Sequence, residues 1–237
     1  MKLAVLTTET PHHAFFVREL AKTAGIELVV IERRRPHFPF ETHHPFEEER
    51  DAYERQAWFG GQDVRVKDLA PTLETDSAND GASVRRLAEA RPDLILVFGT
   101  GRLSPEVIRI GPEAILNLHG GDPEEYRGLD THLWAIYHGD FSGLVTTLHR
   151  VNEGLDDGDI VAQEAVPVAR GMRLHELRRW NTEVCVRLAR APIQALAEGR
   201  GLPSRRQQRR GRYYSAMPAV LKEICRTRFE SHTSKLA

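Results

Sequence analysis

The segment of residues 115–160 constrains this chain most, because it combines two strand patterns with polar residues at their ends. The first pattern is Ile-Leu-Asn-Leu-His, which ends in Asn117 and His119. Side chains alternate along a strand, so Asn117 and His119 are predicted to point the same way. The second pattern leads into an acidic, glycine-bounded loop with Asp156 and Asp157. An amide, an imidazole and a carboxylate form a workable set for transferring an acyl group.

Four motifs carry a resemblance to a known family. They are Asn117-x-His119, Tyr126-Arg127-Gly128, His149-x-Val151 and the run Leu-Asp-Asp-Gly-Asp-Ile at 155–160. In this order they resemble the folate-dependent formyltransferases, which include methionyl-tRNA formyltransferase, glycinamide ribonucleotide formyltransferase and the sugar N-formyltransferases. The resemblance covers roughly residues 93–168. One segment departs from the family pattern: a Pro-Ser-Leu-Leu-Pro-like sequence usually follows the histidine, and this chain has Gly-Gly-Asp-Pro-Glu-Glu at 120–125.

The resemblance implies an N-formyltransferase that uses 10-formyltetrahydrofolate as formyl donor. Asn117 would donate an amide N–H to the negative oxygen of the tetrahedral intermediate. His119 would stabilise that oxygen as imidazolium or shuttle a proton, and Asp156 would orient the imidazole and accept the proton. Asp157 would be a solvent-exposed turn residue. The residues expected to bind the folate are Phe98, Gly99, Thr100, Gly101, Leu103 and Leu155.

The acceptor amine is chosen by elimination. The family's transfer-RNA enzymes have a further carboxyl-terminal domain, and its glycinamide ribonucleotide enzymes have a Gly-Ser-Gly-like turn after the first strand. This chain has about 37 residues after Arg200 and no glycine-rich first turn. A nucleotide-linked amino sugar remains the favoured acceptor, and glycinamide ribonucleotide or methionyl-tRNA stay as alternatives. By similarity to sugar N-formyltransferases, the residues expected to bind the acceptor are Arg127, His132, Arg212 and Tyr213.

The alternation of apolar strand patterns with helical patterns predicts a doubly wound, Rossmann-like α/β fold. It has a mostly parallel sheet with helices on both faces. Strands are expected at 2–6, 26–31, 64–66, 93–98, 114–118, 143–151 and 159–168. Helices are expected at 14–23, 45–59, 80–90, 104–110, 131–138 and 172–196, the last bent or split by Pro192.

Two segments have alternative roles. Residues 1–200 are expected to form the formyltransferase-like domain, and residues 201–237 a carboxyl-terminal extension packing on or near the active site. The extension contains the basic, aromatic segment 205–214, which would either contact the acceptor or form a solvated tail. Its arginines and tyrosines also motivate a rival hypothesis, a non-catalytic nucleic-acid-binding relative. Residues 33–62 are expected to pack on the sheet edge, with a substrate lid or a contact in a homodimer as the alternative.

Composition narrows the function classes. The net charge of -1 makes nucleic acid an unfavoured partner, and no apolar run approaches the roughly 20 residues of a membrane span. Two cysteines make no disulfide framework, so a cytoplasmic protein is expected. The pairs His12-His13 and His43-His44 lack the ligand spacing of a zinc site, so both are expected to face solvent and no metal is expected. Gly99-Thr100-Gly101 lacks the third glycine of a dinucleotide motif.

Overall fold

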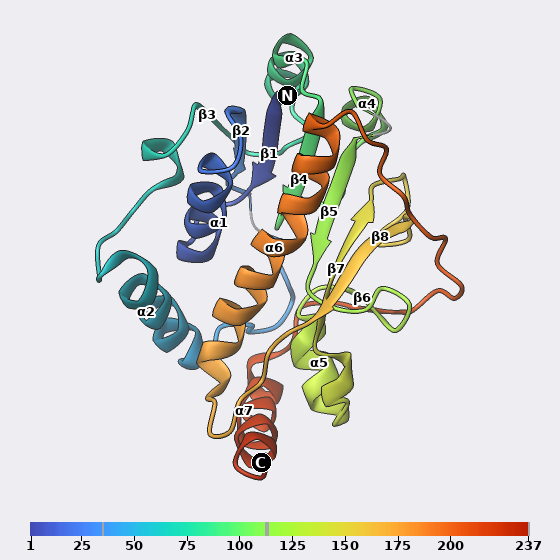
Figure 1. The fold of residues 1–237 in the computed structure, drawn as a ribbon. Coiled ribbons are helices and arrows are strands. Elements are labelled where there is room, and N and C mark those ends of the chain that lie inside the picture. The colour runs from blue at the N-terminus through green and yellow to red at the C-terminus, as the bar shows by residue number, and fades with distance from the viewer. Residues whose placement is uncertain (35, 112–113, 237) are drawn as a thin grey trace.

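A seven-stranded sheet forms the centre of the computed structural model, which describes residues 1–34, 36–111 and 114–236 (Figure 1). The strand order is β3-β2-β1-β4-β5-β7-β8. The pairs from β3 to β5 are parallel, whereas β7 and β8 run antiparallel to their neighbours. The strands are β1 (Leu3–Thr7), β2 (Ile26–Glu32), β3 (Thr72–Thr75), β4 (Leu94–Phe98), β5 (Ile115–His119), β7 (Val145–Arg150) and β8 (Ile160–Ala165).

Helices cover both faces of this sheet. On one face, α1 (Pro11–Ala21) and α6 (Leu177–Ala197) share an apolar core with the sheet, and α6 crosses in front of the strands in Figure 1. On the other face, α3 (Gly81–Ala90) and α4 (Pro105–Ile108) contribute Leu87 and Val107 to a second apolar cluster. Burial of the central strands on both faces explains their continuous apolar sequence. The predicted α/β class, with a mostly parallel sheet flanked by helices, is confirmed.

The winding of the sheet reverses between β1 and β4. The chain continues from β1 through α1 to β2 on one side, and from β4 through α4 to β5 on the other. Ligands in open α/β sheets bind in the crevice at such a reversal, outside the carboxyl ends of the strands. In Figure 1 these ends point toward α5 (Thr131–His138) and α7 (Ala219–Thr233).

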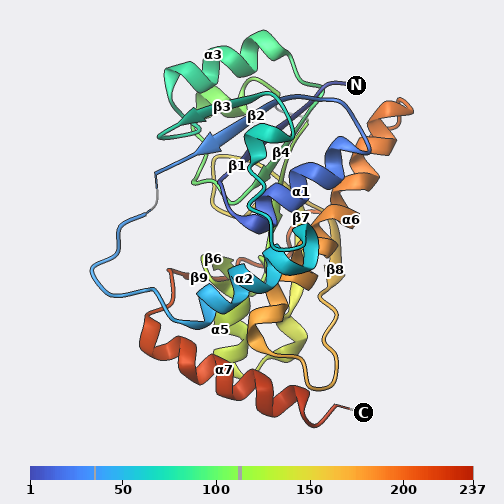
Figure 2. The ribbon, with the colours of Figure 1, turned by 90° about the vertical axis from the view of Figure 1, so that its left-hand side faces the viewer.

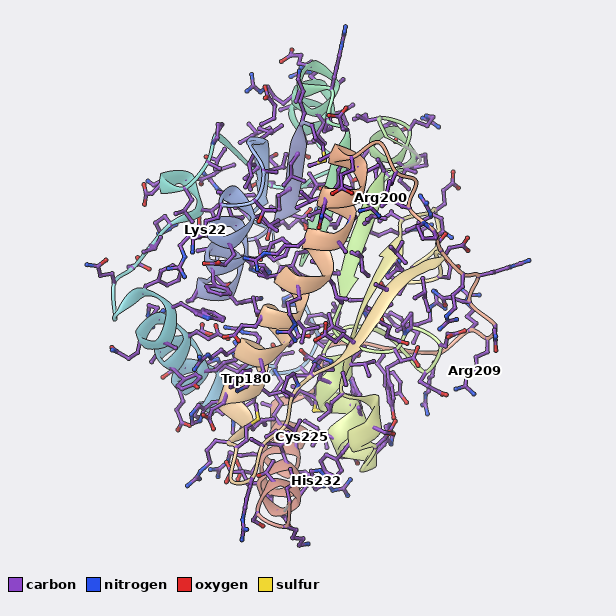
Figure 3. All side chains as sticks on the ribbon, viewed as in Figure 1. Lys22, Trp180, Arg200, Arg209, Cys225 and His232 are labelled. Atoms are coloured by element: carbon purple, nitrogen blue, oxygen red, sulfur yellow. The ribbon has the colours of Figure 1, made fainter. Side chains whose placement is uncertain are left out.

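The residues after 200 are folded onto the rest of the chain. Arg205 forms an isolated bridge with Ile160, and β9 (Arg212–Tyr214) pairs in parallel with β6 (Tyr126–Gly128). Helix α7 packs against α5 through a third apolar cluster that includes Phe229 and Cys225, the latter labelled in Figure 3. In Figure 2, α7 lies along the end of the molecule opposite α3. The solvated-tail alternative for this segment is therefore wrong.

Helix α2 (Phe46–Phe59) packs beside α1 and the 3-10 turn η3 (Leu174–Glu176). The fully buried carboxylate of Glu54 explains this docking, because Arg178 on α6 donates to it from Nε at 2.8 Å and from Nη2 at 2.6 Å. The Nη2 atom of Arg178 also donates to Asp51 at 2.5 Å. Helix α2 of segment 33–62 thus packs against helices, where packing on the sheet edge was expected. Part of the segment, including Phe38 and Arg50, also lines the cavity described below.

The structure differs from the predicted elements in three details. Residues Val66–Asp68 form a 3-10 turn, η1, where a strand was expected, and the edge strand β3 follows it. Helix α6 runs without a break past Pro192, so that proline does not split it. A further 3-10 turn, η2 (Phe141–Gly143), precedes β7.

Across the described parts of the chain, no helix is both long and apolar enough to cross a membrane.

Candidate active site

A cavity of about 590 Å³ lies at the carboxyl ends of the central strands. Its wall combines the turn after β4, the end of β5, the first turn of α5 and the start of α6. Asn117, His119 and Asp156 all line it. The alternation of β5 contributes to this, because Leu116 on the opposite face enters the core under α1 and α6, whereas Leu118 near the end of the strand also borders the cavity. The structure therefore brings the three predicted catalytic residues together.

His149 on β7 orients the amide of Asn117. Strand β7 pairs antiparallel with β5, and this register sets His149 opposite Asn117. The Nδ1–H of His149 donates to the carbonyl oxygen of Arg150 at 2.8 Å, which leaves Nε2 as an acceptor. The Nδ2 atom of Asn117 donates to that Nε2 at 3.1 Å. One amide hydrogen is thus used to fix the group, and the second remains for a ligand. The sequence showed His149 only as part of a family motif, and it did not reveal this contact.

His119 is held with one ring nitrogen toward Asp156. Its Nε2–H donates to the carbonyl oxygen of Tyr126 at 2.7 Å, and its Nδ1 lies 3.8 Å from Oδ1 of Asp156. Burial lowers the pKa of His119, while the charge of Asp156 and the bond to Tyr126 act in the opposite direction. The imidazole is therefore neutral near pH 7, with Nδ1 able to accept a proton that Asp156 would then stabilise.

Asp156 is a buried carboxylate between two imidazoles. Its Oδ1 lies 3.6 Å from Nε2 of His149, and its Oδ2 accepts the backbone N–H of Gly128 at 2.9 Å. Burial by itself raises the pKa of Asp156, but the charge interaction with His119 and the hydrogen bond from the backbone N–H of Gly128 outweigh it. The net effect lowers the pKa well below its usual range, so the group stays ionised at neutral pH. An ionised carboxylate of this kind is better suited to stabilising the protonated form of His119 than to holding a proton itself.

The loop that carries Asp156 is held from two sides. Asp156 has a φ of 50°, in the left-handed region that few non-glycine residues adopt. The Nε2 of Gln207 donates to the carbonyl oxygens of Asp156 and Gly158, both at 2.9 Å. Arg127 donates to the carbonyl oxygen of Leu155. The carboxyl-terminal extension thus clamps the backbone of this loop, a role that the sequence did not reveal.

The predicted folate-binding residues lie near one another. Phe98, Gly99, Thr100, Gly101 and Leu155 line the main cavity. Leu103 lines a smaller adjoining cavity of about 70 Å³, together with Asn117, His149 and Asp156. The Oγ1 of Thr100 is buried without a hydrogen-bond partner among the described residues, so it is available to a ligand.

The four predicted acceptor-binding residues divide into two pairs. His132 and Tyr213 line the cavity, and the Tyr213 side chain is 57% exposed. Arg127 is buried and absent from the cavity wall, and its guanidinium holds the Asp156 loop as described above. Arg212 is exposed, lies outside the wall and stacks over the ring of Tyr214 at 5.3 Å. Of the four residues, only His132 and Tyr213 are placed on the wall of the cavity.

His12 and His13 contradict the expectation that they face solvent. Both are buried at the start of α1 and line the cavity. Thr10 Oγ1 lies 2.7 Å from Nδ1 of His12 and 2.8 Å from Nδ1 of His13, and both rings meet Phe98 edge-on. The position of α1 at the reversal between β1 and β4 explains their burial. His43 is exposed, as expected, and His44 is half-buried.

Two further predictions concern Asp157 and metal binding. Asp157 is only half-exposed, and its carboxylate lies over Gly154, where a side chain would collide with it. The expected fully exposed turn residue is therefore not observed. Within residues 1–34, 36–111 and 114–236, no three His, Cys, Asp or Glu side chains are grouped so as to hold a metal ion.

Comparisons with known proteins give the family. Residues 2–184 match the family model described as formyl transferase. The chain is 36% identical over 118 residues to methionyl-tRNA formyltransferase from Clostridium acetobutylicum, an alignment that covers 49% of this chain and 38% of that enzyme. The chain thus spans well under half the length of this curated relative.

Two solved structures show the same fold. Glycinamide ribonucleotide transformylase 1 from Symbiobacterium toebii superposes with a TM-score of 0.60 at 22% identity, covering 88% of this chain and 94% of that one. The formyltransferase PseJ from Anoxybacillus kamchatkensis has a TM-score of 0.55 at 17% identity, with coverages of 91% and 86%. Because the family model matches more than half of the chain, this protein belongs to the formyl transferase family.

Proposed function

We propose that this protein transfers the formyl group of 10-formyltetrahydrofolate to an amine. The observation that carries the proposal is the convergence of Asn117, His119 and Asp156 on one cavity wall, with the amide of Asn117 oriented by His149. Membership of the formyl transferase family supports the reaction type. PseJ, which has this fold, was solved with tetrahydrofolate and a formamido sugar nucleotide, and this supports the choice of donor.

The turn after β4 would hold the donor. Gly99 and Gly101 expose backbone there, and the unpartnered Oγ1 of Thr100 offers a hydrogen bond. Leu155 would cover the other side, because it lines both the main and the adjoining cavity. When bound, the donor supplies the formyl carbon that the amine attacks. The residues of the chain then have to handle one developing negative charge and two proton movements.

Each catalytic group has a separate task in this proposal. The free amide hydrogen of Asn117 donates to the formyl oxygen as that oxygen becomes negative, a contribution of about 10²–10³ in rate. His119 accepts the proton that leaves the attacking nitrogen at Nδ1 and returns it to the departing folate nitrogen. Asp156 stabilises the imidazolium between these steps. Acid-base catalysis of this kind contributes about 10²–10⁴.

We further propose that the acceptor is a nucleotide-linked amino sugar. Tyr213 supports this choice, because its exposed ring on the cavity wall could stack on a sugar or a base. The sugar-nucleotide product in PseJ supports the same class. The basic segment 205–214 supports a nucleotide-linked acceptor less strongly than its composition indicated, because Arg205 and Arg209 are paired with Glu124 and Glu125. Arg209 lies on the outer part of this segment, as Figure 3 shows.

The test is incubation of the protein with 10-formyltetrahydrofolate and a panel of amines, read by mass spectrometry. The panel contains UDP- and dTDP-linked amino sugars, glycinamide ribonucleotide and methionyl-tRNA. A gain of one CO unit by a sugar nucleotide is the expected result. Formylation of the ribonucleotide or the transfer RNA alone would keep the reaction and overturn the acceptor. Absence of any formyl product, with tetrahydrofolate bound, would overturn the catalytic proposal.

A further inference from the structure

The turn after His119 consists of two glycines whose φ angles other residues could also adopt. Neither Gly120 nor Gly121 has a positive φ. The N–H of Gly121 donates to the carbonyl oxygen of His119 at 3.0 Å, which closes a tight three-residue turn. Consecutive glycines have the widest choice of backbone conformations, so this bond alone would fix the turn weakly. The family pattern has a proline directly after the histidine, and the fixed φ of proline would restrict the same turn.

Two buried threonines hold both carbonyl oxygens of this turn. Thr131, the first residue of α5, donates from Oγ1 to the carbonyl oxygen of Gly120. Thr147 on β7 donates from Oγ1 to the carbonyl oxygen of Gly121 at 2.7 Å, and Gln163 on β8 donates to the same hydroxyl at 3.0 Å. Thr131 is 5% exposed and Thr147 is completely buried, so water has little access to either hydroxyl. Two separate elements therefore fix the turn.

The fixed turn lies directly against the imidazole of His119. A Cβ atom built at Gly121 would stand 3.1 Å from Nε2 of His119 and 3.0 Å from Oγ1 of Thr131, so a side chain here would crowd both groups. The same Nε2 donates to the carbonyl oxygen of Tyr126. If the turn moved, the ring would lose its packing on one side. Its Nδ1 would then lose its fixed direction toward Asp156.

We propose that Thr131 and Thr147 are positioning residues for the proposed formyl transfer. Their hydroxyl groups fix the glycine turn 120–121, and this turn holds the imidazole of His119 toward Asp156. The inference rests on the proposed function, in which His119 moves the protons. Thr147 does not line the main cavity, so it acts on the reaction only through the turn.

Replacement by valine removes each hydroxyl and keeps the shape of the side chain. Thr131→Val and Thr147→Val should each lower the turnover number about tenfold, because the imidazole loses part of its alignment. The KM for 10-formyltetrahydrofolate should change less than twofold. Thr233→Val is the matched control, since its buried hydroxyl donates to the carbonyl oxygen of Met172 at 2.8 Å and neither residue lines the cavity. Unchanged turnover in Thr147→Val, or an equal loss in the control, would overturn the proposal.

A proline at position 120 should take over the role of the lost hydroxyl. The N–H of Gly120 has no hydrogen bond in the described parts of the chain, and the preceding His119 is extended, as a residue before proline prefers. A Cβ atom at Gly120 would be 3.3 Å from its nearest neighbour, the side-chain atom Cε1 of His132. Adding Gly120→Pro to Thr147→Val should therefore return turnover to within about threefold of the wild type. Gly121→Pro removes the bond to His119 and should restore nothing.

The single variant Gly120→Pro completes this set and should keep the turnover of the wild type. Loss of turnover in this variant would show that the turn has another shape, and it would overturn the proposal. Failure of the proline to improve Thr147→Val would do the same, because restriction of the turn would then not be what the hydroxyl supplies.

A measurement on His119 itself separates this inference from the proposed reaction. Burial is the largest influence on the pKa of this imidazole and lowers it, so a ring that is held less firmly and is more hydrated should titrate at a higher pH. NMR titration without substrates should show this rise in Thr131→Val and Thr147→Val but not in Thr233→Val. Such a result supports the positioning role even if no formyl product forms. An unchanged titration in both variants overturns it, even where formyl transfer proceeds as proposed.

Discussion

At the scale of single residues, Asp156 is the group on which the proposed chemistry depends most. Its carboxylate lies between His119 and His149, and its low pKa keeps it ionised. Asparagine has the same shape but no charge, so Asp156→Asn should leave His119 without support for its imidazolium form. We expect the turnover number to fall about 10²–10⁴-fold, the range of a lost acid-base group. Steady-state formyl transfer gives the value, and tetrahydrofolate binding should stay near that of the wild type.

Asp157 provides the matched control for this experiment. Its side chain lies over Gly154 and is absent from the wall of the main cavity. Asp157→Asn should therefore reduce turnover less than threefold, with a melting curve to exclude unfolding. Greater damage from Asp157→Asn than from Asp156→Asn would show that the roles of the two carboxylates are reversed. Unchanged turnover in both variants would remove Asp156 from the mechanism.

The sequence revealed some of these residues and not others. Asn117 and His119 could be identified from the sequence alone. Strand alternation places them on one face, and this inference needs no knowledge of the rest of the fold. His149 reaches Asn117 only through the antiparallel pairing of β5 with β7, and a single sequence does not show that register. His12 and His13 looked like solvent-exposed polar residues because their burial depends on Phe98, which is more than 80 positions away in the chain.

At the scale of elements, the extension and the Asp156 loop act as one unit. Gln207 donates to two carbonyl oxygens of that loop, and Gln207→Met would remove both bonds while keeping similar bulk. Two lost hydrogen bonds of about 1 kcal/mol each would loosen the position of Asp156. We expect turnover to fall roughly tenfold or more, with little change in the KM for the folate, because loss of positioning acts on the reacting geometry.

The neighbouring residue offers a control of the same type. Gln208 is exposed, and its bond to Glu124 uses the backbone N–H, which Gln208→Met retains. This variant should keep the activity of the wild type. Equal losses for the two methionine variants would mean that the segment acts through general stability. Deletion from residue 205 onward is less informative, because it also removes β9 and α7.

The contact between α2 and α6 depends on a buried ion pair. Glu54 is fully buried and accepts two bonds from Arg178. Glu54→Leu leaves the guanidinium of Arg178 with Asp51 as its remaining carboxylate partner. The variant should therefore lower the free energy of unfolding by about 1.5–3 kcal/mol, the value of hydrogen bonds to a charged group. The double variant Glu54→Leu, Arg178→Leu should recover part of that loss. Urea denaturation measures both, and Glu48→Gln, at an exposed position of the same helix, should change little.

The elements differ in how well the sequence predicted them. The strands at 94–98 and 115–119 were clear, because strands buried on both faces require continuous apolar residues. The strands β3, β6 and β9 have only three or four residues, too few to show a period. The basic segment that precedes α7 left contact with the acceptor and a solvated tail as open alternatives, and in the fold Glu124 and Glu125 neutralise two of its arginines. Composition cannot show such pairing.

At the scale of the whole molecule, buried neutral histidines make stability depend on pH. The pKa of His132 is lowered from 6.5 to about 4 by burial, and burial lowers the pKa of His12 and His119 as well. Between pH 6.5 and 4 the unfolded chain therefore binds more protons than the folded chain. The free energy of unfolding should fall as the pH drops through this window, by about 3 kcal/mol at most from His132.

Urea unfolding at several pH values between 7 and 4 measures this slope. His132→Gln should flatten it, whereas His43→Gln at an exposed position should leave it unchanged. Asp156 acts in a more acidic range, because its lowered pKa gives stability that is present above pH 3.8 and is lost only as the pH falls below that value. A slope that is the same in the wild type and in His132→Gln would show that His132 is not a neutral buried group.

The clamp between Gln207 and the Asp156 loop has a consequence for protein synthesis. The bonded residues are 51 positions apart. At about 5–20 residues per second, the ribosome needs roughly 3–10 s to add that length of chain. Strands β1 to β8 all precede residue 205, so the nascent chain can assemble its sheet before Gln207 exists. A newly made molecule would therefore gain its scaffold first, and the geometry of its proposed catalytic loop would be set only after residue 207 has been added.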